Sequence, residues 1–215
     1  MTTDAGIVHV IDDDASWRMS VQRLLSAAGY RVLLHESAEK FLEGGDLEGP
    51  GCVLLDMRMP GLSGLELQQR IAERHHTLPI VFISGHGDIP TSVVAMRSGA
   101  EDFLTKPVET EVLLGAVERA ILRDHEDRER RERLALLRSR ISTLTPTERR
   151  VFDLVVRGRL NKHIAAELGT AERTVKWHRQ HIMQKLELES LAEMVSLAER
   201  LGLISEQIPP ASTSS

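Results

Sequence analysis

The chain has 215 residues, of which 41% are apolar and 27% charged, so it can bury one sizeable core and a second, smaller one. Its single cysteine, Cys52, excludes an internal disulfide and lies in an apolar run that predicts a buried strand. No run approaches the roughly 18–20 apolar residues of a membrane span, and the first residues lack the basic start and apolar middle of a signal peptide. We therefore expect a two-domain cytoplasmic protein that does not enter a membrane.

The net charge of −5 is distributed unevenly along the chain. Residues 1–124 contain 11 Lys and Arg against 19 Asp and Glu, whereas residues 140–204 contain 11 against 8, a net charge of +3. Charges farther apart than about 8–10 Å are largely screened at physiological salt, so the local balance decides whether a segment can meet phosphate. The C-terminal third is therefore the part in which to look for contacts to nucleic acid.

The first 124 residues alternate short β-branched runs with longer helical patterns, which is typical of repeated βα units around a parallel sheet. In the first helical pattern, Val21, Leu24, Leu25 and Ala28 fall at i, i+3, i+4 and i+7. Right-handed crossovers would place the helices on both faces of the sheet. The predicted strands are Gly6–Asp12, Tyr30–His35, Gly51–Asp56, Pro79–Ser84 and Glu101–Thr105.

Residues 124–133 are charged at every position except His125, which is compatible with a flexible linker or with an extension of the preceding helix. No Pro occurs in residues 108–143, and acidic residues precede basic ones at i, i+4, so a helix is favoured. A solvated connecting helix is expected rather than a continuous coiled coil, because charged residues interrupt the heptad pattern. The interrupting residues are Asp124, Asp127 and Arg131.

Polar residues follow four of the predicted strands at the point where each strand ends. They are Asp12–Asp14 after the first, Asp56 after the third, Ser84 after the fourth and Lys106 after the fifth. Ligand sites of open parallel sheets lie at these carboxyl ends. Clustered carboxylates repel one another unless a hard cation such as Mg²⁺ binds, and Lys and Ser can hold phosphoryl oxygens. The set suits phosphoryl transfer to Asp56, although the three successive acids alone could be a solvated strand end.

Residues 144–203 contain no strand pattern and divide into four short helices. Thr145 and Glu148 have the spacing of a capping box around a proline, which predicts the start of the first helix. A turn containing Gly and Thr then separates residues 162–168 from residues 172–188. This is a helix–turn–helix arrangement.

The segment 172–188 has one apolar stripe, and the opposite side is predicted to read DNA. Lys and Gln can hydrogen-bond base edges in a major groove, and Arg and Lys can neutralise phosphates. A basic helix can equally be an ordinary solvated surface. His178 and His181 have a metal-like i, i+3 spacing without a third ligand nearby, so packing for His178 and phosphate contact for His181 are expected. The side chains on the predicted reading side are Arg173, Lys176, Trp177, Gln180 and Gln184.

The motifs HVIDDD, LLDMRMPGLSG, IVFISGHGD and GAEDFLTKP resemble the receiver domain of two-component response regulators. The resemblance implies a doubly wound (βα)5 domain over residues 6–123 with strand order 2-1-3-4-5. It implies that Asp56 accepts a phosphoryl group from a sensor histidine kinase, that Ser84 and Lys106 hold this group, and that Phe103 turns inward behind it. A cis bond before Pro107 and a Mg²⁺ ion are also implied. The ligands of the Mg²⁺ would be Asp13, Asp56, the backbone carbonyl of Arg58 and, through water, Asp12.

The stretch LTPTERRVFDLVVRGRLNKHIAAELGTAERTVKWHRQHIMQKL resembles the LuxR-type helix–turn–helix. With the receiver, it makes the chain similar to the FixJ and NarL family of regulators, nearest the StyR- and TodT-like ones. This implies an α/β receiver and an all-α DNA-binding domain over residues 142–204. The charge spacing predicts a charged helical linker over residues 124–141 between them, and the Pro, Ser and Thr content of residues 205–215 predicts a disordered tail. The implied partners are a sensor histidine kinase, promoter DNA and a second copy of the chain when phosphorylated.

Carried over by position, the resemblance assigns DNA contacts to both helices of the helix–turn–helix. Two departures from the family pattern are Leu160 and Ala171, which stand where Ser often caps a helix, so that Asn161 or Thr170 would have to substitute. Trp177 is unusually bulky for a residue that faces a groove. The expected base contacts are Lys176, Trp177 and Gln180, and the expected contacts near the DNA backbone are Asn161, Lys162, Thr174 and Arg179. Arg173 on the reading side and His181 are further expected DNA contacts from the pattern of residues 172–188.

Two other functions fit parts of the sequence. The spacing of Asp12 and Asp14 loosely matches the nucleophile loop of haloacid-dehalogenase-type phosphatases, but Ser16 stands where Thr or Val is expected and the C-terminal third is unexplained. The receiver could also act as an interaction module independent of phosphorylation, although every residue of the pocket is present. We expect no enzymatic activity beyond Mg²⁺-dependent self-phosphorylation and dephosphorylation.

Overall fold

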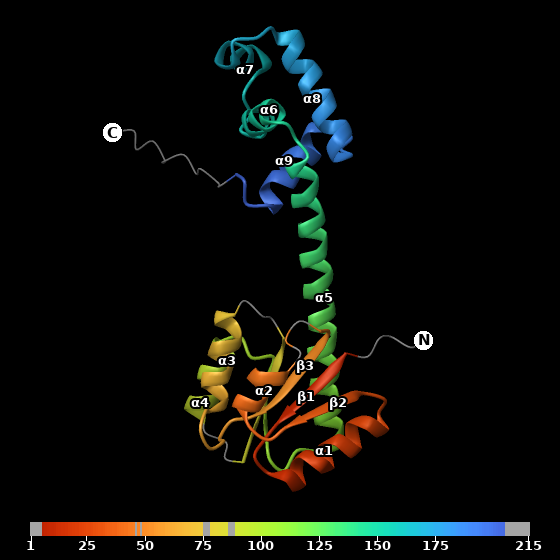
Figure 1. Ribbon diagram of the computed structural model, residues 1–215, viewed down its shortest axis with the longest axis vertical. Helices are drawn as coiled ribbons and strands as arrows, with labels where there is room; N and C mark the ends of the chain where they lie inside the picture. Colours follow the sequence, from red (N-terminus) through yellow and green to blue (C-terminus); the bar gives the residue numbers. More distant parts are fainter. Residues whose placement is uncertain (1–5, 46, 48, 75–77, 86–88, 205–215) are drawn as a thin grey trace, which may run out of the picture. The chain divides into compact units, whose positions relative to one another are not determined.

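The structure is a computed structural model that describes residues 6–204 except 46, 48, 75–77 and 86–88. The chain divides into two compact units, residues 1–128 and 129–215 (Figure 1). The predicted disordered tail, residues 205–215, lies outside the described residues. Each unit is described by itself below.

The N-terminal unit contains a five-stranded parallel sheet with the order β2-β1-β3-β4-β5 (Figure 1). All five predicted strands are confirmed to within one residue at each end. Every residue of β3 and β4 is buried, as expected for a parallel sheet covered on both faces. The strands are β1 (Ile7–Ile11), β2 (Arg31–His35), β3 (Gly51–Asp56), β4 (Ile80–Ser84) and β5 (Asp102–Thr105).

Helices cover both faces of this sheet, so the unit is doubly wound as predicted. On one face α1 and the first part of α5 bury Val21, Leu25, Leu113 and Val117. On the other face α2, α3 and α4 bury side chains such as Phe41, and Figure 1 shows α3 and α4 side by side there. The helices are α1 (Ala15–Ala27), α2 (Ala38–Gly44), α3 (Gly64–Glu73), α4 (Ile89–Arg97) and α5 (Thr110–Ser142).

Helix α5 is continuous over 33 residues, so the charged segment is helical as expected. Asp124 is nevertheless buried, at 1% exposure, and its carboxylate accepts hydrogen bonds from the Gly51 amide (2.9 Å) and from Arg128 Nε (2.7 Å). The Arg128 guanidinium also donates to the carbonyl of Gly49. The prediction that this whole segment is solvated is therefore wrong at Asp124, which fastens α5 to the start of β3.

The C-terminal unit contains the four predicted helices around an apolar core that includes Val151, Phe152, Ile164, Ile182 and Leu197. The third of these helices ends at Leu186 rather than at residue 188, because Glu187 adopts a left-handed conformation with φ 55°. Among the described residues, no helix is long and apolar enough to cross a bilayer. The four helices are α6 (Pro146–Val156), α7 (Asn161–Leu168), α8 (Glu172–Leu186) and α9 (Leu191–Arg200).

Candidate phosphoryl-acceptor site and nucleic-acid interface

The sheet register brings the predicted acidic residues to one edge. Ile11 pairs with Leu55, so Asp12 and Asp56 follow side by side at the carboxyl ends of β1 and β3. Both carboxylates are buried, Asp12 at 0% and Asp56 at 6% exposure. Ser84 ends β4, is itself buried, and its carbonyl accepts a hydrogen bond of 2.7 Å from the Lys106 amide. Parallel pairing therefore assembles four of the predicted residues from separate parts of the chain.

Lys106 joins the two carboxylates. Its Nζ donates to Asp12 Oδ2 at 2.6 Å and to Asp56 Oδ1 at 2.8 Å. Burial, which lowers the pKa of Lys106, is outweighed by these two hydrogen bonds, so the pKa is raised and the side chain stays charged. The pKa of Asp12 is also raised, because burial outweighs the hydrogen bonds that it accepts from Lys106 and from the Asp14 amide. The pocket thus holds two carboxylates around one ammonium group.

The donor set has the chemistry that Mg²⁺ prefers, since it consists of carboxylate and carbonyl oxygens. The structure brings Asp12 and Asp56 together, whereas Asp13 is exposed. Within the described residues, no three His, Cys, Asp or Glu side chains are close enough together to hold a metal as they stand. Lys106 occupies the space between the two buried carboxylates. For Mg²⁺ to be held by this set, the Asp13 carboxylate would have to turn inward and Lys106 would have to release carboxylate oxygens of Asp12 and Asp56 to the ion.

The loop after β3 and the strand β5 complete the pocket. The Arg58 amide donates to Asp56 Oδ2 at 2.7 Å, which orients the carboxylate. Phe103 is partly buried and packs against the core on the side of α3 and α4, with its ring centroid 6.4 Å from that of Phe82. The bond between Lys106 and Pro107 is cis, as the resemblance implies.

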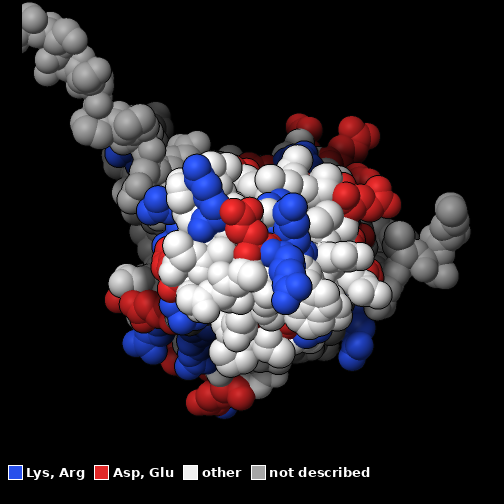
Figure 2. All heavy atoms as spheres, turned by 90° about the horizontal axis from the view of Figure 1, so that it is seen from above, with Lys and Arg blue, Asp and Glu red and all other residues white. Residues whose placement is uncertain are grey.

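In the second unit, the exposed side of α8 carries the predicted reading residues. Arg173, Lys176, Trp177 and Gln180 are exposed, whereas Thr174 is partly buried. On the face seen in Figure 2, Lys and Arg side chains form separate groups around a broad uncharged area, with an acidic group between two of them. Basic side chains flanking an uncharged centre are compatible with phosphate contacts on either side of base contacts.

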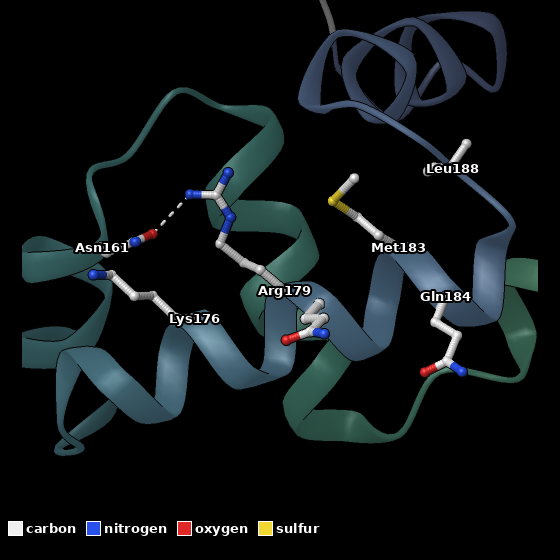
Figure 3. A pocket seen from close by; sticks show the side chains of 7 residues that line it. Asn161, Lys176, Arg179, Met183, Gln184 and Leu188 are labelled. Atoms are coloured by element: carbon white, nitrogen blue, oxygen red, sulfur yellow. Dashed lines mark hydrogen bonds between the residues drawn. The ribbon is translucent and has the colours of Figure 1, made fainter.

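A groove runs along α8 and is closed at one end by α7 (Figure 3). Arg179 crosses this groove and its Nη1 donates to Asn161 Oδ1 at 2.8 Å. Neither α7 nor α8 has a side-chain N-cap, so the expectation that Asn161 or Thr170 would cap these helices is wrong. Asn161 holds Arg179 instead. The groove is lined by Asn161, Lys176, Arg179, Gln180, Met183, Gln184 and Leu188.

Aromatic stacking fixes Trp177 on the surface of α8. Its ring centroid lies 4.0 Å from that of His181, with the planes tilted by 33°, and 5.0 Å from His178 in an edge-on arrangement. The indole remains 52% exposed. Nδ1 of His178 is buried, and no hydrogen-bond partner lies near it among the described residues. The bulky side chain is thus presented in one orientation rather than being free to swing.

A buried ion pair positions α8 against α6. Glu148 is 4% exposed and forms the predicted capping box with Thr145. The same carboxylate accepts a hydrogen bond of 2.6 Å from Lys185 in the last turn of α8. Burial raises the pKa of Glu148, but the hydrogen bonds from Lys185 and Thr145 outweigh it and hold the pKa at about 2. One glutamate therefore both starts α6 and anchors the end of α8.

Two family models match this chain, one in each unit. Residues 8–118 match the response regulator receiver domain, and residues 142–198 match the bacterial regulatory proteins of the luxR family. Nodulation protein W of Bradyrhizobium diazoefficiens is 45% identical over 197 residues, 92% of this chain and 87% of that protein. This chain belongs to the two-component response regulators with a LuxR-type DNA-binding domain.

Other relatives are also similar to this response regulator over most of its length. The response regulator protein TodT of Pseudomonas putida is 39% identical over 94% of this chain and 88% of that protein. The solved structure of the response regulator StyR is 48% identical and superposes with a TM-score of 0.78, over 90% of this chain and 98% of that one. The solved structure of full-length FixJ from B. japonicum is 39% identical with a TM-score of 0.57, over 93% of this chain and 98% of that one.

Two residues of this response regulator were missed by the sequence analysis. Trp17 lies with its ring centroid 4.4 Å from the Nζ of Lys106, and Arg18 Nη1 donates to the carbonyl of Asp12 at 2.5 Å. Both belong to the first turn of α1, whose start follows directly on the acidic residues. Their proximity to the acidic run in the sequence was a signal, but the approach of Lys106 to the indole depends on how β5 is placed in the sheet.

Proposed function

We propose that Asp56 is the phosphoryl acceptor of this response regulator. The observation that carries the proposal is that Asp56 lies beside Asp12 at the carboxyl edge of the sheet, with one ammonium group within 2.8 Å of both carboxylates. In the transfer, the P–N bond of a kinase phosphohistidine breaks as a P–O bond to Asp56 forms. The imidazole leaves with the electron pair and takes up a proton from water. Lys106 would then pair with the new phosphoryl oxygens.

Receiver domains generally use Mg²⁺ for this reaction, and we propose Asp12, Asp13, Asp56 and the carbonyl of Arg58 as its ligands here. The ion, when bound, neutralises negative charge on the carboxylates and on the phosphoryl group. The protein's own groups orient the acceptor and supply positive charge. The Arg58 amide orients Asp56, and Lys106 supplies a positive charge that is already at the site.

The output would be DNA binding through α8 and the start of α7. Ser84 would hydrogen-bond the phosphoryl group, and Phe103 would follow inward, altering the surface near α4 and favouring association with a second phosphorylated copy. Two linked domains bind two half-sites more tightly than one, because the second contact becomes intramolecular. The proposed DNA contacts are Asn161, Lys162, Arg173, Thr174, Lys176, Trp177, Arg179, Gln180 and His181.

We propose domain boundaries that match these roles. Residues 6–123 form the receiver, residues 124–141 a helical linker and residues 142–204 the DNA-binding domain, and the protein would work in the cytoplasm as a regulator rather than as an enzyme. Its partners would be a sensor histidine kinase, promoter DNA and a second copy of itself. Phosphorylation of the receiver would thus control the DNA-binding domain.

The experiment compares wild type with Asp56→Ala and Glu43→Ala, the second removing a carboxylate of α2 that is 70% exposed and outside the proposed ligand set. Each protein is treated with acetyl phosphate and Mg²⁺, and phosphate incorporation, oligomeric state and affinity for DNA selected from a random library are measured. Incorporation and a concerted gain in mass and DNA affinity are expected for wild type and Glu43→Ala but not for Asp56→Ala. Equal DNA affinity with and without the donor, despite incorporation, would favour an interaction module independent of phosphorylation.

A further inference from the structure

Lys106 has a third neighbour besides its two carboxylates. The ammonium group lies over the Trp17 ring, 4.4 Å from its centroid, while 2.6 Å and 2.8 Å separate it from Asp12 and Asp56. The lysine side chain is 23% exposed, so the contact is partly shielded from water. A cation over the face of an indole is attracted by the negative face of the ring, and the attraction is stronger when the pair is desolvated.

The indole is held in place from two directions. Its backbone amide donates to the Asp14 carboxylate at 3.2 Å, as part of the cap that starts α1. Its side chain is partly buried against the core formed by α1, α5 and the sheet, which includes Val8, Val21 and Leu25. Trp17 is therefore a fixed platform, whereas a lysine side chain has four flexible carbons and a point charge that can point in many directions.

We propose that Trp17 is a positioning residue for phosphoryl transfer, which keeps the ammonium group of Lys106 at the edge of the acidic pocket. The inference rests on the proposed role of Asp56 and adds a residue that the resemblance does not assign.

The physical argument is that the carboxylate partners of Lys106 change during the reaction. A cation bound by the acidic residues competes with Lys106 for the same oxygens, and phosphorylation converts one carboxylate into an acyl phosphate. Unlike the two carboxylates, the indole attracts the ammonium group equally before and after these changes. With Trp17 present, Lys106 stays next to Asp56 when its ion pairs are lost, and less conformational entropy has to be given up when the phosphoryl group arrives.

The test is a double-mutant cycle on the full chain with Trp17→Leu and Lys106→Ala. Leucine fills much of the space of the indole but has no aromatic face, and Trp17→Phe restores a weaker one. The rate of Asp56 phosphorylation by acetyl phosphate at saturating Mg²⁺ should fall about two- to fivefold in Trp17→Leu, the range of a partly exposed cation–π contact. Trp17→Phe should recover most of this rate. In the Lys106→Ala background, Trp17→Leu should have no further effect.

The outcomes separate this inference from the proposed function. An equal loss with and without Lys106 would mean that Trp17 acts through packing alone, and a wild-type rate in Trp17→Leu would mean that it does not act; either overturns the inference while Asp56 remains the acceptor. Absence of any phosphorylation in wild type would overturn the proposed function as well.

A spectroscopic readout does not depend on turnover. The chain has two tryptophans, so Trp177→Phe leaves Trp17 as the only indole emitter. Removing the cation from its face with Lys106→Ala should change the intensity and wavelength of its emission. Beryllofluoride with Mg²⁺, a non-covalent phosphoryl mimic, should leave the emission closer to that of the parent than to that of Lys106→Ala, because the ammonium stays over the ring. Identical spectra with and without Lys106 would contradict the contact.

Discussion

The carboxylate of Asp124 in α5 accepts a hydrogen bond of 2.9 Å from the amide of Gly51, the first residue of β3. The same carboxylate pairs with Arg128, one helical turn later, at 2.7 Å. If α5 lifted away from the sheet at this point, the Gly51 amide would lose its acceptor and Arg128 would lose its contact with the carbonyl of Gly49, whereas the pair of Asp124 with Arg128 lies within the helix itself. The helix that leaves the receiver is therefore fastened to the sheet at residues 124–128, and the charged segment is not uniformly solvated.

We expect Asp124→Ala to destabilise the N-terminal unit by roughly 2–4 kcal/mol, because it leaves the buried Gly51 amide without its acceptor and removes the carboxylate that pairs with Arg128. Hydrogen exchange at the Gly51 amide and the urea midpoint of the receiver transition measure the effect. Asp127→Ala is the matched control, since Asp127 forms an i, i+4 pair with an Arg123 side chain that is 60% exposed. Equal stability of the two variants would show that the buried contact does not hold α5.

Glu148 should make the stability of the C-terminal unit sensitive to acid. Its pKa is about 2 in the folded protein and 4.5 ordinarily, so the folded state binds its proton less readily than the unfolded state does. The stabilisation is complete above about pH 5 and is lost as the pH falls towards 2. We expect Glu148→Gln to cost about 1–3 kcal/mol at pH 7 and progressively less between pH 5 and pH 2.

Thermal or urea unfolding of both proteins across this pH range tests the prediction. Glu167→Gln, an exposed change on α7, serves as the control and should stay within about 0.5 kcal/mol of wild type at every pH. A constant difference between wild type and Glu148→Gln down to pH 2 would mean that the ion pair with Lys185 is not the source of the stability.

The missing helix caps predict stabilising substitutions. Leu160 and Ala171 occupy N-cap positions with extended backbone and no side-chain hydrogen bond, and Leu160 is 59% exposed, so little packing would be lost. Leu160→Ser and Ala171→Ser should each raise the free energy of unfolding by about 0.5–1 kcal/mol, measured by urea denaturation. Ser190→Ala, which removes an existing cap of α9, should lower it by a similar amount. If Leu160→Ser is no more stable than Leu160→Ala, the serine side chain does not cap α7 and the prediction is wrong.

Arg179 and Asn161 should affect DNA binding in different ways. Arg179→Ala removes a positive charge, so the slope of log affinity against log salt concentration should decrease in magnitude by about 1 per bound copy. Asn161→Ala keeps the charge but releases its 2.8 Å hydrogen bond, so affinity should fall with little change in slope. Arg157→Ala, an exposed arginine outside the proposed contacts, should leave the slope unchanged. An equal decrease of the slope in Arg157→Ala and Arg179→Ala would mean that the overall charge of the protein, rather than a contact of Arg179 with DNA, causes the effect.

Much of the fold could be predicted because its signals are local in the chain. The apolar run Gly51–Asp56 has the length and the flanking residues of a buried strand, and the capping pair of Thr145 and Glu148 is complete within four residues. The acidic residues, Ser84 and Lys106 could be placed at one edge because the carboxyl ends of parallel strands must meet there. These predictions needed only periodicity and the rules of parallel sheets.

The remaining contacts depend on which side chain reaches which partner in space. Asp124 looked like a break in a heptad, because no local pattern connects it with an amide 73 residues earlier. Asn161 looked like a substitute cap, but Arg179 competes for its oxygen across the groove. Trp17 carried no signal as a neighbour of Lys106, and Asp13 is predicted as a ligand yet lies exposed while Lys106 occupies the space between the carboxylates.

The sequence by itself therefore determined the two domains, their helices and strands, and the edge of the sheet at which the chemistry is expected, since each of these follows from local pattern and strand direction. Only the tertiary structure decided that the ammonium group of Lys106 lies between Asp12 and Asp56 and over the ring of Trp17, and that Asp124 fastens α5 to β3. The physical reason is that a buried charge takes whichever partner the packing brings within hydrogen-bond distance, and sequence separation does not limit that choice.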